Sequence, residues 1–155
     1  MSSVQQLQWS VFDFSELDAQ LFHDIVKLRI DVFVVEQNCP YPEVDGEDPD
    51  ALHVVGRQAD GALVAYARIL PPSTDGIPHV GRVVVDKEHR GTGLGKRVMQ
   101  EAFEVLRERY GSTRSAIAAQ THLQQFYMDL GYVRTGADYL WDGIPHVDMV
   151  LNEED

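Results

Sequence analysis

The 155-residue sequence contains one cysteine, Cys39, and no apolar run that approaches the roughly 18 residues needed to span a membrane. A single cysteine excludes an internal disulfide and a cysteine-based metal cluster, and it suits a reducing compartment. The first ten residues, MSSVQQLQWS, lack the basic and apolar regions of a signal peptide. We therefore expect a cytoplasmic protein that does not enter a membrane.

Basic residues are also few: 13 Lys and Arg stand against 25 Asp and Glu, which gives a formal net charge of -12. Such a charge repels nucleic acid backbones and anionic membranes, so neither is an expected partner. The one clear basic cluster surrounds a glycine-rich segment and consists of Lys87, His89, Arg90, Lys96 and Arg97. A positive patch on an acidic protein predicts a local site for an anionic ligand.

No internal repeats or long linkers interrupt the chain, and its length fits one compact domain over residues 1–155. Hydrophobic spacing and turn residues predict strands at 7–14, 52–58, 63–70, 79–85, 115–119, 132–140 and 146–151. Helices are predicted at 15–34 with Ser15 as N-cap, at 94–110 and at 121–130. This order, β α β β β α β α β β, predicts an α/β fold with a mixed, mostly antiparallel sheet of about six or seven strands flanked by helices.

Residues 36–50, EQNCPYPEVDGEDPD, hold three prolines, one glycine and six acidic residues, so a loop is predicted there. Loops of this length in compact domains often serve function. The acidic residues miss the ligand positions of an EF-hand calcium loop, and the histidines of the chain lack the spacing of metal ligands. No metal site is predicted.

The segment VVVDKEHRGTGLGKRVM, residues 83–99, joins a β-branched strand to an amphipathic helix through a turn with three glycines. The first N–H groups of a helix have no partner within it and carry the positive end of the helix dipole. Glycines lack Cβ atoms, so a ligand approaches such amides closely. The turn therefore predicts a phosphate site, to which Arg90 and Lys96 add positive charge.

Two common nucleotide-binding patterns do not fit this turn. The Walker pattern fails because Arg97 stands where Ser or Thr would hold magnesium. The dinucleotide pattern G-x-G-x-x-G fails because Gly91, Gly93 and Gly95 have a different spacing. The alternative to a phosphate site is a glycine-rich turn with a structural role alone.

The pattern that remains is R-x-x-G-x-G, residues 90–95. In this pattern, and in the order of elements over nearly the whole chain, the sequence resembles the GNAT superfamily of acetyl-CoA-dependent N-acetyltransferases. The resemblance implies a GNAT-like fold and acetyl-CoA as co-substrate, with its pyrophosphate on the turn. The turn residues to which this role carries over are Arg90, Gly91, Gly93, Leu94, Gly95 and Lys96. It also implies that the backbone of Val83 and Val85 pairs with the pantetheine arm like an added strand.

Two longer segments resemble the ElaA branch of this superfamily. They are LRIDVFVVEQNCPYPEVDGED, residues 28–48, and YLWDGIPHVDM, residues 139–149. The physiological substrate of that branch is poorly defined, so the resemblance does not name the acceptor.

Acetyl transfer to an amine needs a base for the amine proton and an acid for the leaving thiolate. In the superfamily the acid is commonly a tyrosine in a segment that FYMDLGY, residues 126–132, resembles, which implies Tyr127. The alternative for Tyr127 is a core residue under the sheet. Gln120, at the end of the preceding strand, is a further cofactor-binding candidate.

The base is less well defined by the sequence. We select Glu36, which lies at the acidic loop, as the candidate, because a carboxylate could hold the ammonium form of an amine and pass its proton to water. Glu43, His79 and His146 are alternatives, and no spacing fixes the role of any of the four.

The predicted function is acetyl-CoA-dependent N-acetyl transfer to a primary amine, by direct attack in a ternary complex. The acceptor is a small-molecule or peptide amine, and the residues leave open whether the protein forms a homodimer. One alternative is a non-catalytic CoA-binding regulatory module. Another is an acyltransferase like the acyl-homoserine-lactone synthases. The residues that loosely resemble those synthases are Arg29, Val32, Phe33, Glu43, Asp45, Asp48 and Arg68.

Overall fold

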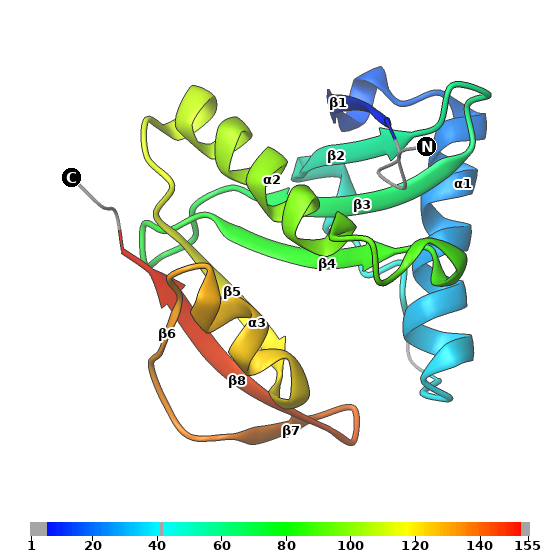
Figure 1. The fold of residues 1–155 in the computed structure, drawn as a ribbon. Coiled ribbons are helices and arrows are strands. Elements are labelled where there is room, and N and C mark those ends of the chain that lie inside the picture. Colours follow the sequence, from blue (N-terminus) through cyan, green and yellow to red (C-terminus); the bar gives the residue numbers. More distant parts are fainter. Residues whose placement is uncertain (1–5, 41, 153–155) are drawn as a thin grey trace.

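Residues 6–40 and 42–152 of the computed structural model are described here, and they form one eight-stranded sheet flanked by helices (Figure 1). The strands are β1 (Gln8–Asp13), β2 (Leu52–Arg57), β3 (Leu63–Leu70), β4 (His79–Val85), β5 (Ser115–Gln120), β6 (Val133–Arg134), β7 (Tyr139–Trp141) and β8 (Ile144–Leu151). The α-helices are α1 (Ala19–Ile30), α2 (Leu94–Tyr110) and α3 (Gln124–Asp129). None of the helices in these residues has the length and apolar character needed to cross a membrane.

The sheet divides into two parts that meet at β4 and β5. The strand order is β1-β2-β3-β4-β5-β8-β6, and β7 also pairs with β8. Every pair is antiparallel except β4 and β5, which share a single parallel register pair, His79 with Ala116. Figure 1 shows these two strands meeting near one end and running apart toward the other. We call the space between these two diverging strands the wedge. The mixed, mostly antiparallel pairing confirms the sheet predicted from the sequence.

A β-bulge in β4 changes which face of the sheet its side chains occupy. Tyr66 lies opposite Val84 while Arg68 lies opposite Gly81, so β4 carries one extra residue between them. Val80 packs in the larger core beneath α2, whereas Val84 packs with α1 on the other face. Side chains four residues apart on a regular strand would share a face, so the bulge accounts for the switch.

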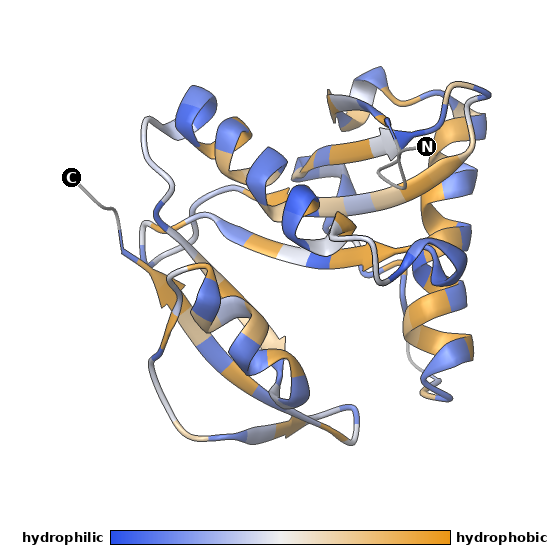
Figure 2. Cartoon of the chain, viewed as in Figure 1, coloured by the Kyte–Doolittle hydropathy of each residue, from blue (hydrophilic) through white to orange (hydrophobic). Residues whose placement is uncertain are grey.

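Each face of the central strands is covered by one long helix. Val98, Ala102 and Leu106 of α2 are fully buried against the larger core, and α1 buries Leu21 and Ile25 on the opposite face. In Figure 2 both helices alternate between hydrophobic and hydrophilic residues, as amphipathic helices on a sheet do.

The start of the first helix differs from the prediction. Ser15 was predicted as its N-cap, but Ser15 lies in a 3-10 turn, and the cap of α1 is Asp18, whose side chain accepts a hydrogen bond from the Leu21 amide at 2.7 Å. At its other end α1 continues into a π-helical segment, Asp31–Glu36. This segment replaces the regular helix predicted up to residue 34, and π-helical turns are frequent at functional sites.

The predicted strand at 132–140 is two short strands, β6 and β7. Val133 lies opposite Val150, and Tyr139 lies opposite His146, so the ladder with β8 shifts by two residues between them. The intervening chain, residues 135–138, leaves the ladder after the Thr135 amide bonds to the Asp148 carbonyl. Gly136 and Asp138 in this stretch are residues that strands disfavour. A tight turn at Asp142 and Gly143 then joins β7 to β8.

Candidate active site

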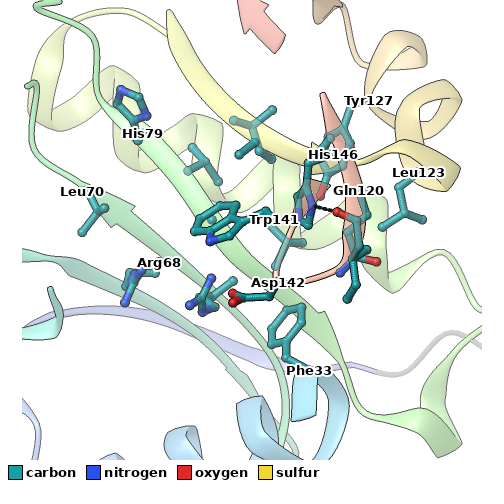
Figure 3. A pocket seen from close by; sticks show the side chains of 18 of the residues that line it. Phe33, Arg68, Leu70, His79, Gln120, Leu123, Tyr127, Trp141, Asp142 and His146 are labelled. Carbon is teal, nitrogen blue, oxygen red and sulfur yellow. Dashed lines mark hydrogen bonds between the residues drawn. The ribbon is translucent and has the colours of Figure 1, made fainter. Parts of the chain in front are cut away.

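The wedge between β4 and β5 holds a cavity of about 190 Å³. Its walls come from both strands, from α3, from the β7–β8 hairpin and from the π-helical segment (Figure 3). Side chains that line it include Phe33, Gln120, Tyr127, Trp141, Asp142 and His146. The cavity therefore brings together segments that are far apart in the sequence.

One wall of the wedge is the edge of β4, which beyond its single pair with β5 has no partner strand among the described residues. The Asp86 amide donates to the Val64 carbonyl at 2.7 Å, which fixes the alternation of the antiparallel ladder. The N–H and C=O of Val85 consequently face away from β3 and toward the opening. An unpaired edge is a template for an extended ligand that adds to the sheet. The pairing of Val83 and Val85 with a pantetheine arm stays a prediction.

The glycine turn lies at the mouth of the wedge, where α2 begins. Gly91 and Gly93 have φ angles of +81° and +84°, a left-handed conformation that favours glycine. A Cβ atom added at either position would meet no atom within 4 Å, so the space beside the turn is open. The side chain of Leu94 is buried in the protein, while Lys96 is exposed. The turn thus offers amides, the start of a 17-residue helix and positive charge.

Gly95 is less constrained than the other two glycines. A Cβ atom there would lie 3.5 Å from the ring of Phe126, an ordinary contact distance. Packing and backbone conformation therefore do not by themselves demand glycine at this position.

Arg90 does not face an open site but is held by two partners. Its guanidinium donates to both carboxylate oxygens of Glu36, at 2.6 and 2.9 Å, and its Nε donates to the Val85 carbonyl at 3.1 Å. The hydrogen bond from Arg90 lowers the pKa of Glu36. Glu36 is absent from the described residues that line the cavity. A carboxylate that is paired and less basic is poorly suited to accept a proton, so the geometry does not favour the predicted base role of Glu36.

Tyr127 is brought into the cavity by α3. Its side chain is buried, and the rings of Phe126 and Tyr132 pack edge-on against it with centroids 5.0 and 5.9 Å away. Its hydroxyl has no hydrogen-bond partner among the side chains that the structure describes. Burial raises the pKa of Tyr127, so the hydroxyl keeps its proton at neutral pH. This is the state that an acid needs.

Two polar contacts join the opposite walls of the wedge. The side-chain amides of Gln120 and Gln37 bond to each other at 3.2 and 3.3 Å, and the Cys39 thiol donates to the Asp142 carbonyl at 3.1 Å. The segment after the π-helical turn is thereby tied to β5 and to the β7–β8 hairpin. The amide of Gln120, predicted to bind the cofactor, is engaged with Gln37 in this structure.

Two histidines line the cavity, and their surroundings differ. Nδ1 of His146 lies 2.7 Å from the Ile144 carbonyl, and the ring is buried. Nε2 of His79 lies 3.2 Å from a carboxylate oxygen of Asp75, and this side chain is 39% exposed. His79 also stands at the closed end of the wedge, where β4 and β5 pair.

A buried ionic cluster lies on the α1 face of the sheet, beside the cavity. Arg29 is fully buried and bonds Glu43 at 2.7 Å and Asp48 at 2.8 Å. Arg68, which lines the cavity, bonds Asp45 at 3.0 Å and Asp48 at 3.2 Å. Burial alone would raise the pKa of Asp48, but its bonds to Arg29 and Arg68 outweigh this and lower it. The acidic loop is therefore folded onto the protein by ion pairs.

Arg82 completes this cluster, and no sequence pattern indicated it. Its Nε donates to Glu43 at 2.7 Å, and its guanidinium lies 5.7 Å from the centre of the Phe33 ring. Its φ of +50° accompanies the bulge in β4, and the signal that could have indicated this bulge is Gly81, an isolated glycine inside the strand directly before Arg82. The aromatic residue Trp141 and the acidic Asp142 were likewise recognised as part of a turn but not as walls of the cavity.

Comparison with known proteins gives a consistent result over nearly the whole chain. Residues 24–153 match the family model of the acetyltransferase (GNAT) domain. Protein ElaA of Escherichia coli is 40% identical over 146 residues, which cover 92% of this chain and 95% of ElaA. A crystal structure of an acyl-CoA N-acyltransferase from Pseudomonas aeruginosa superposes with a TM-score of 0.90 at 38% identity, covering 95% of this chain and all of that chain.

More distant structures share the fold alone. A CoA-dependent acyl-homoserine lactone synthase, BjaI, superposes with a TM-score of 0.79 at 17% identity, and the match covers 96% of this chain and 84% of that chain. The arrangement of strands and helices is thus shared with a protein of low sequence identity.

Proposed function

Because the chain belongs to the GNAT acetyltransferase family and is similar to ElaA, we propose that this acyltransferase moves an acetyl group from acetyl-CoA to a primary amine. The observation that carries the proposal is the unpaired edge of β4. It leads from the glycine turn into the cavity where Tyr127 lies. A site for a diphosphate, a groove for an extended arm and a protonated hydroxyl therefore follow one another along one path.

The residues of this chain divide the binding of acetyl-CoA between them. The amides at Gly91, Gly93 and Leu94 take the pyrophosphate, and Lys96 adds a charge that no described partner neutralises. Val83 and Val85 pair with the amide groups of the pantetheine arm through their backbone. The pantetheine arm would displace Arg90 from the Val85 carbonyl, because that carbonyl lies on the path of the arm. Arg90 then joins the phosphate site.

Transfer then takes place by direct attack in the cavity. The neutral amine nitrogen forms a bond to the thioester carbon, and the C–S bond breaks as the tetrahedral intermediate collapses. Tyr127 gives its hydroxyl proton to the leaving sulfur, which is the role that its burial and protonated state support. The acceptor is a small-molecule or peptide amine that enters from the side of the acidic loop.

The test is release of CoA thiol from acetyl-CoA in the presence of a panel of amines. Once an acceptor is found, Tyr127→Phe is expected to lower kcat by about 10²- to 10⁴-fold, the usual loss when a general acid is removed. The matched control is Tyr132→Phe, since Tyr132 is also buried but bonds to Ser115 at 2.7 Å. An unchanged kcat in Tyr127→Phe would exclude the acid role.

The two alternatives predict other outcomes in the same assay. A CoA-binding regulatory module would bind CoA and acetylate no amine of the panel. An enzyme like the acyl-homoserine-lactone synthases would form a lactone from S-adenosylmethionine and an acyl carrier. The observation behind the lactone test is the buried cluster, which contains five of the residues that resemble those synthases. They are Arg29, Glu43, Asp45, Asp48 and Arg68.

A further inference from the structure

We infer that His146 removes the proton from the acceptor amine, with Nε2 as the accepting atom. The inference rests on the proposed function and adds the group that the sequence left undefined. Its evidence is the position, the tautomer and the fixed orientation of one imidazole ring.

His146 is placed beside the reacting centre by the sheet. It lies in β8 directly opposite Gln120, the last residue of β5, and therefore at the end of β5 that points away from the closed end of the wedge. It lines the same cavity as Tyr127 (Figure 3). Only 8% of the residue is exposed, so the ring is largely shielded from bulk water.

The hydrogen bond to Ile144 selects the tautomer of His146. A backbone carbonyl only accepts hydrogen bonds, so Nδ1, 2.7 Å from the Ile144 oxygen, must carry a proton. In the neutral ring Nε2 then holds a free lone pair, and no described side chain bonds to it. The His146 ring is stacked on the Tyr139 ring with centroids 6.1 Å apart. The centroid of the Trp141 ring lies 5.3 Å from that of His146. These contacts hold the imidazole in one orientation.

The other three candidates for the base are less suited. Glu36 is paired with Arg90, and Glu43 is buried between Arg29 and Arg82 with a carboxylate oxygen 2.7 Å from each. His79 contacts Asp75 and stands at the closed end of the wedge. His146 thus combines a free basic nitrogen with a place in the open part of the cavity.

Several charged or titratable groups face this imidazole. They are Tyr127 of α3, Tyr139 of β7, Asp142 of the β7–β8 turn, and Arg68, His79 and Arg82 on the opposite wall. The hydroxyl of Tyr139 donates its proton to Asp148 at 2.6 Å, so we assign it no part in proton transfer to or from the amine. Asp142 is the one carboxylate among the described residues lining the cavity, where Arg68 and Arg82 also lie.

The proton balance of the step closes within the site. Nε2 takes one proton from the amine nitrogen as this nitrogen bonds to the thioester carbon. The C–S bond breaks, and the sulfur takes one proton from the Tyr127 hydroxyl. The proton on His146 then returns through solvent to the tyrosinate, so that the products are an amide and a thiol and both side chains regain their starting states.

The experiment is the pH dependence of kcat/KM for wild type, His146→Gln and His79→Gln, with one amine acceptor throughout. Histidine changes charge between about pH 5 and 8, so wild-type activity is expected to fall as the pH is lowered through this range. His146→Gln is expected to lose about 10²- to 10⁴-fold at neutral pH and to lack that histidine limb. His79→Gln is expected to retain it. Because the acceptor is the same, its own titration contributes equally to all three profiles.

A second variant guards against an effect of packing. In His146→Ala, added imidazole is expected to restore part of the rate, and urea unfolding establishes that the variant is folded. Retention of the histidine limb in His146→Gln, or no rescue of a folded His146→Ala, would overturn the inference while wild-type turnover still supports the proposed function. Failure of the wild type to acetylate any amine would instead contradict the proposed function itself.

Discussion

The two sides of the wedge are built from different kinds of chemical groups. On the side of the glycine turn, the groups that face the opening are backbone amides and carbonyls, and the turn is exposed. On the side of the acidic loop, three arginines and three carboxylates meet through side chains, and Arg29 at their centre has no exposed surface. One side is open and built from the main chain, whereas the other is buried and built from charges.

This difference determines what each side tolerates. A site made of main-chain groups depends on conformation and on open space, so side chains near it are replaceable unless they block the approach or repel the ligand. A buried ionic cluster depends on every partner, because the loss of one removes charge that the remaining desolvated groups need. Substitutions on the first side should therefore affect binding, and those on the second should affect stability.

The largest effect is expected for Gly93→Asp. A carboxylate at the start of α2 would repel a pyrophosphate and place a side chain in the open space beside the turn. Binding of CoA, measured by calorimetry, is expected to fall below detection. Wild-type affinity in this variant would contradict the assignment of the turn.

A matched control separates charge from backbone strain. Gly61 lies in the β2–β3 hairpin with a φ of +92°, and a Cβ atom there also meets no atom within 4 Å. Both glycine substitutions should cost about 1–2 kcal/mol in unfolding free energy, because a left-handed conformation disfavours other residues. Gly61→Asp is expected to bind CoA like the wild type.

The next effect is on stability, through Arg29→Met. It leaves Glu43 and Asp48 buried without their shared partner, for which the expected cost is about 3–5 kcal/mol of unfolding free energy. Urea unfolding followed by circular dichroism measures this loss. Arg107→Met is the control, since Arg107 makes an exposed ion pair with Glu104 and its loss should cost at most about 1 kcal/mol. Equal stabilities of the two variants would refute a structural role for the cluster.

The smallest effect is expected for Glu36→Gln. An exposed ion pair contributes about 0.2–1 kcal/mol, so the release of Arg90 should tighten CoA binding by no more than about 5-fold. We expect kcat to stay within about 3-fold of wild type, because Glu36 does not reach the cavity in this structure. Glu104→Gln removes a comparable exposed pair far along α2 and should change neither constant. A large fall in kcat in Glu36→Gln would restore the original interpretation of this residue as the base.

The central elements could be predicted from sequence because their signals are local. The bounds predicted for β3, β4 and α2 agree with the structure, since β-branched runs, the Asp60-Gly61 turn and the left-handed cap at Gly111 each act within a few residues. The glycine turn was recognisable for the same reason. Its predicted ligand stays a proposal.

The rest depends on contacts that a single sequence does not display. Glu36 and Arg90 are 54 residues apart, and nothing local indicates that they pair. The choice among Glu36, Glu43, His79 and His146 needed the register of β5 against β8, which places His146 beside Gln120. The bulge at Arg82 and the break between β6 and β7 arise from packing and ladder register, and the glycines beside them, Gly81 and Gly136, do not by themselves fix either register.

β4 and β5 share a single ladder pair, so most of the facing edge of β4 is open to an added strand. An extended molecule that bonds to the free edge of β4 would fill the place of a missing strand, so it would be a temporary part of the architecture as well as a reactant. Its departure after each turnover would return the two halves of the sheet to a joint held at one end, together with the Gln37–Gln120 and Cys39–Asp142 contacts across the opening.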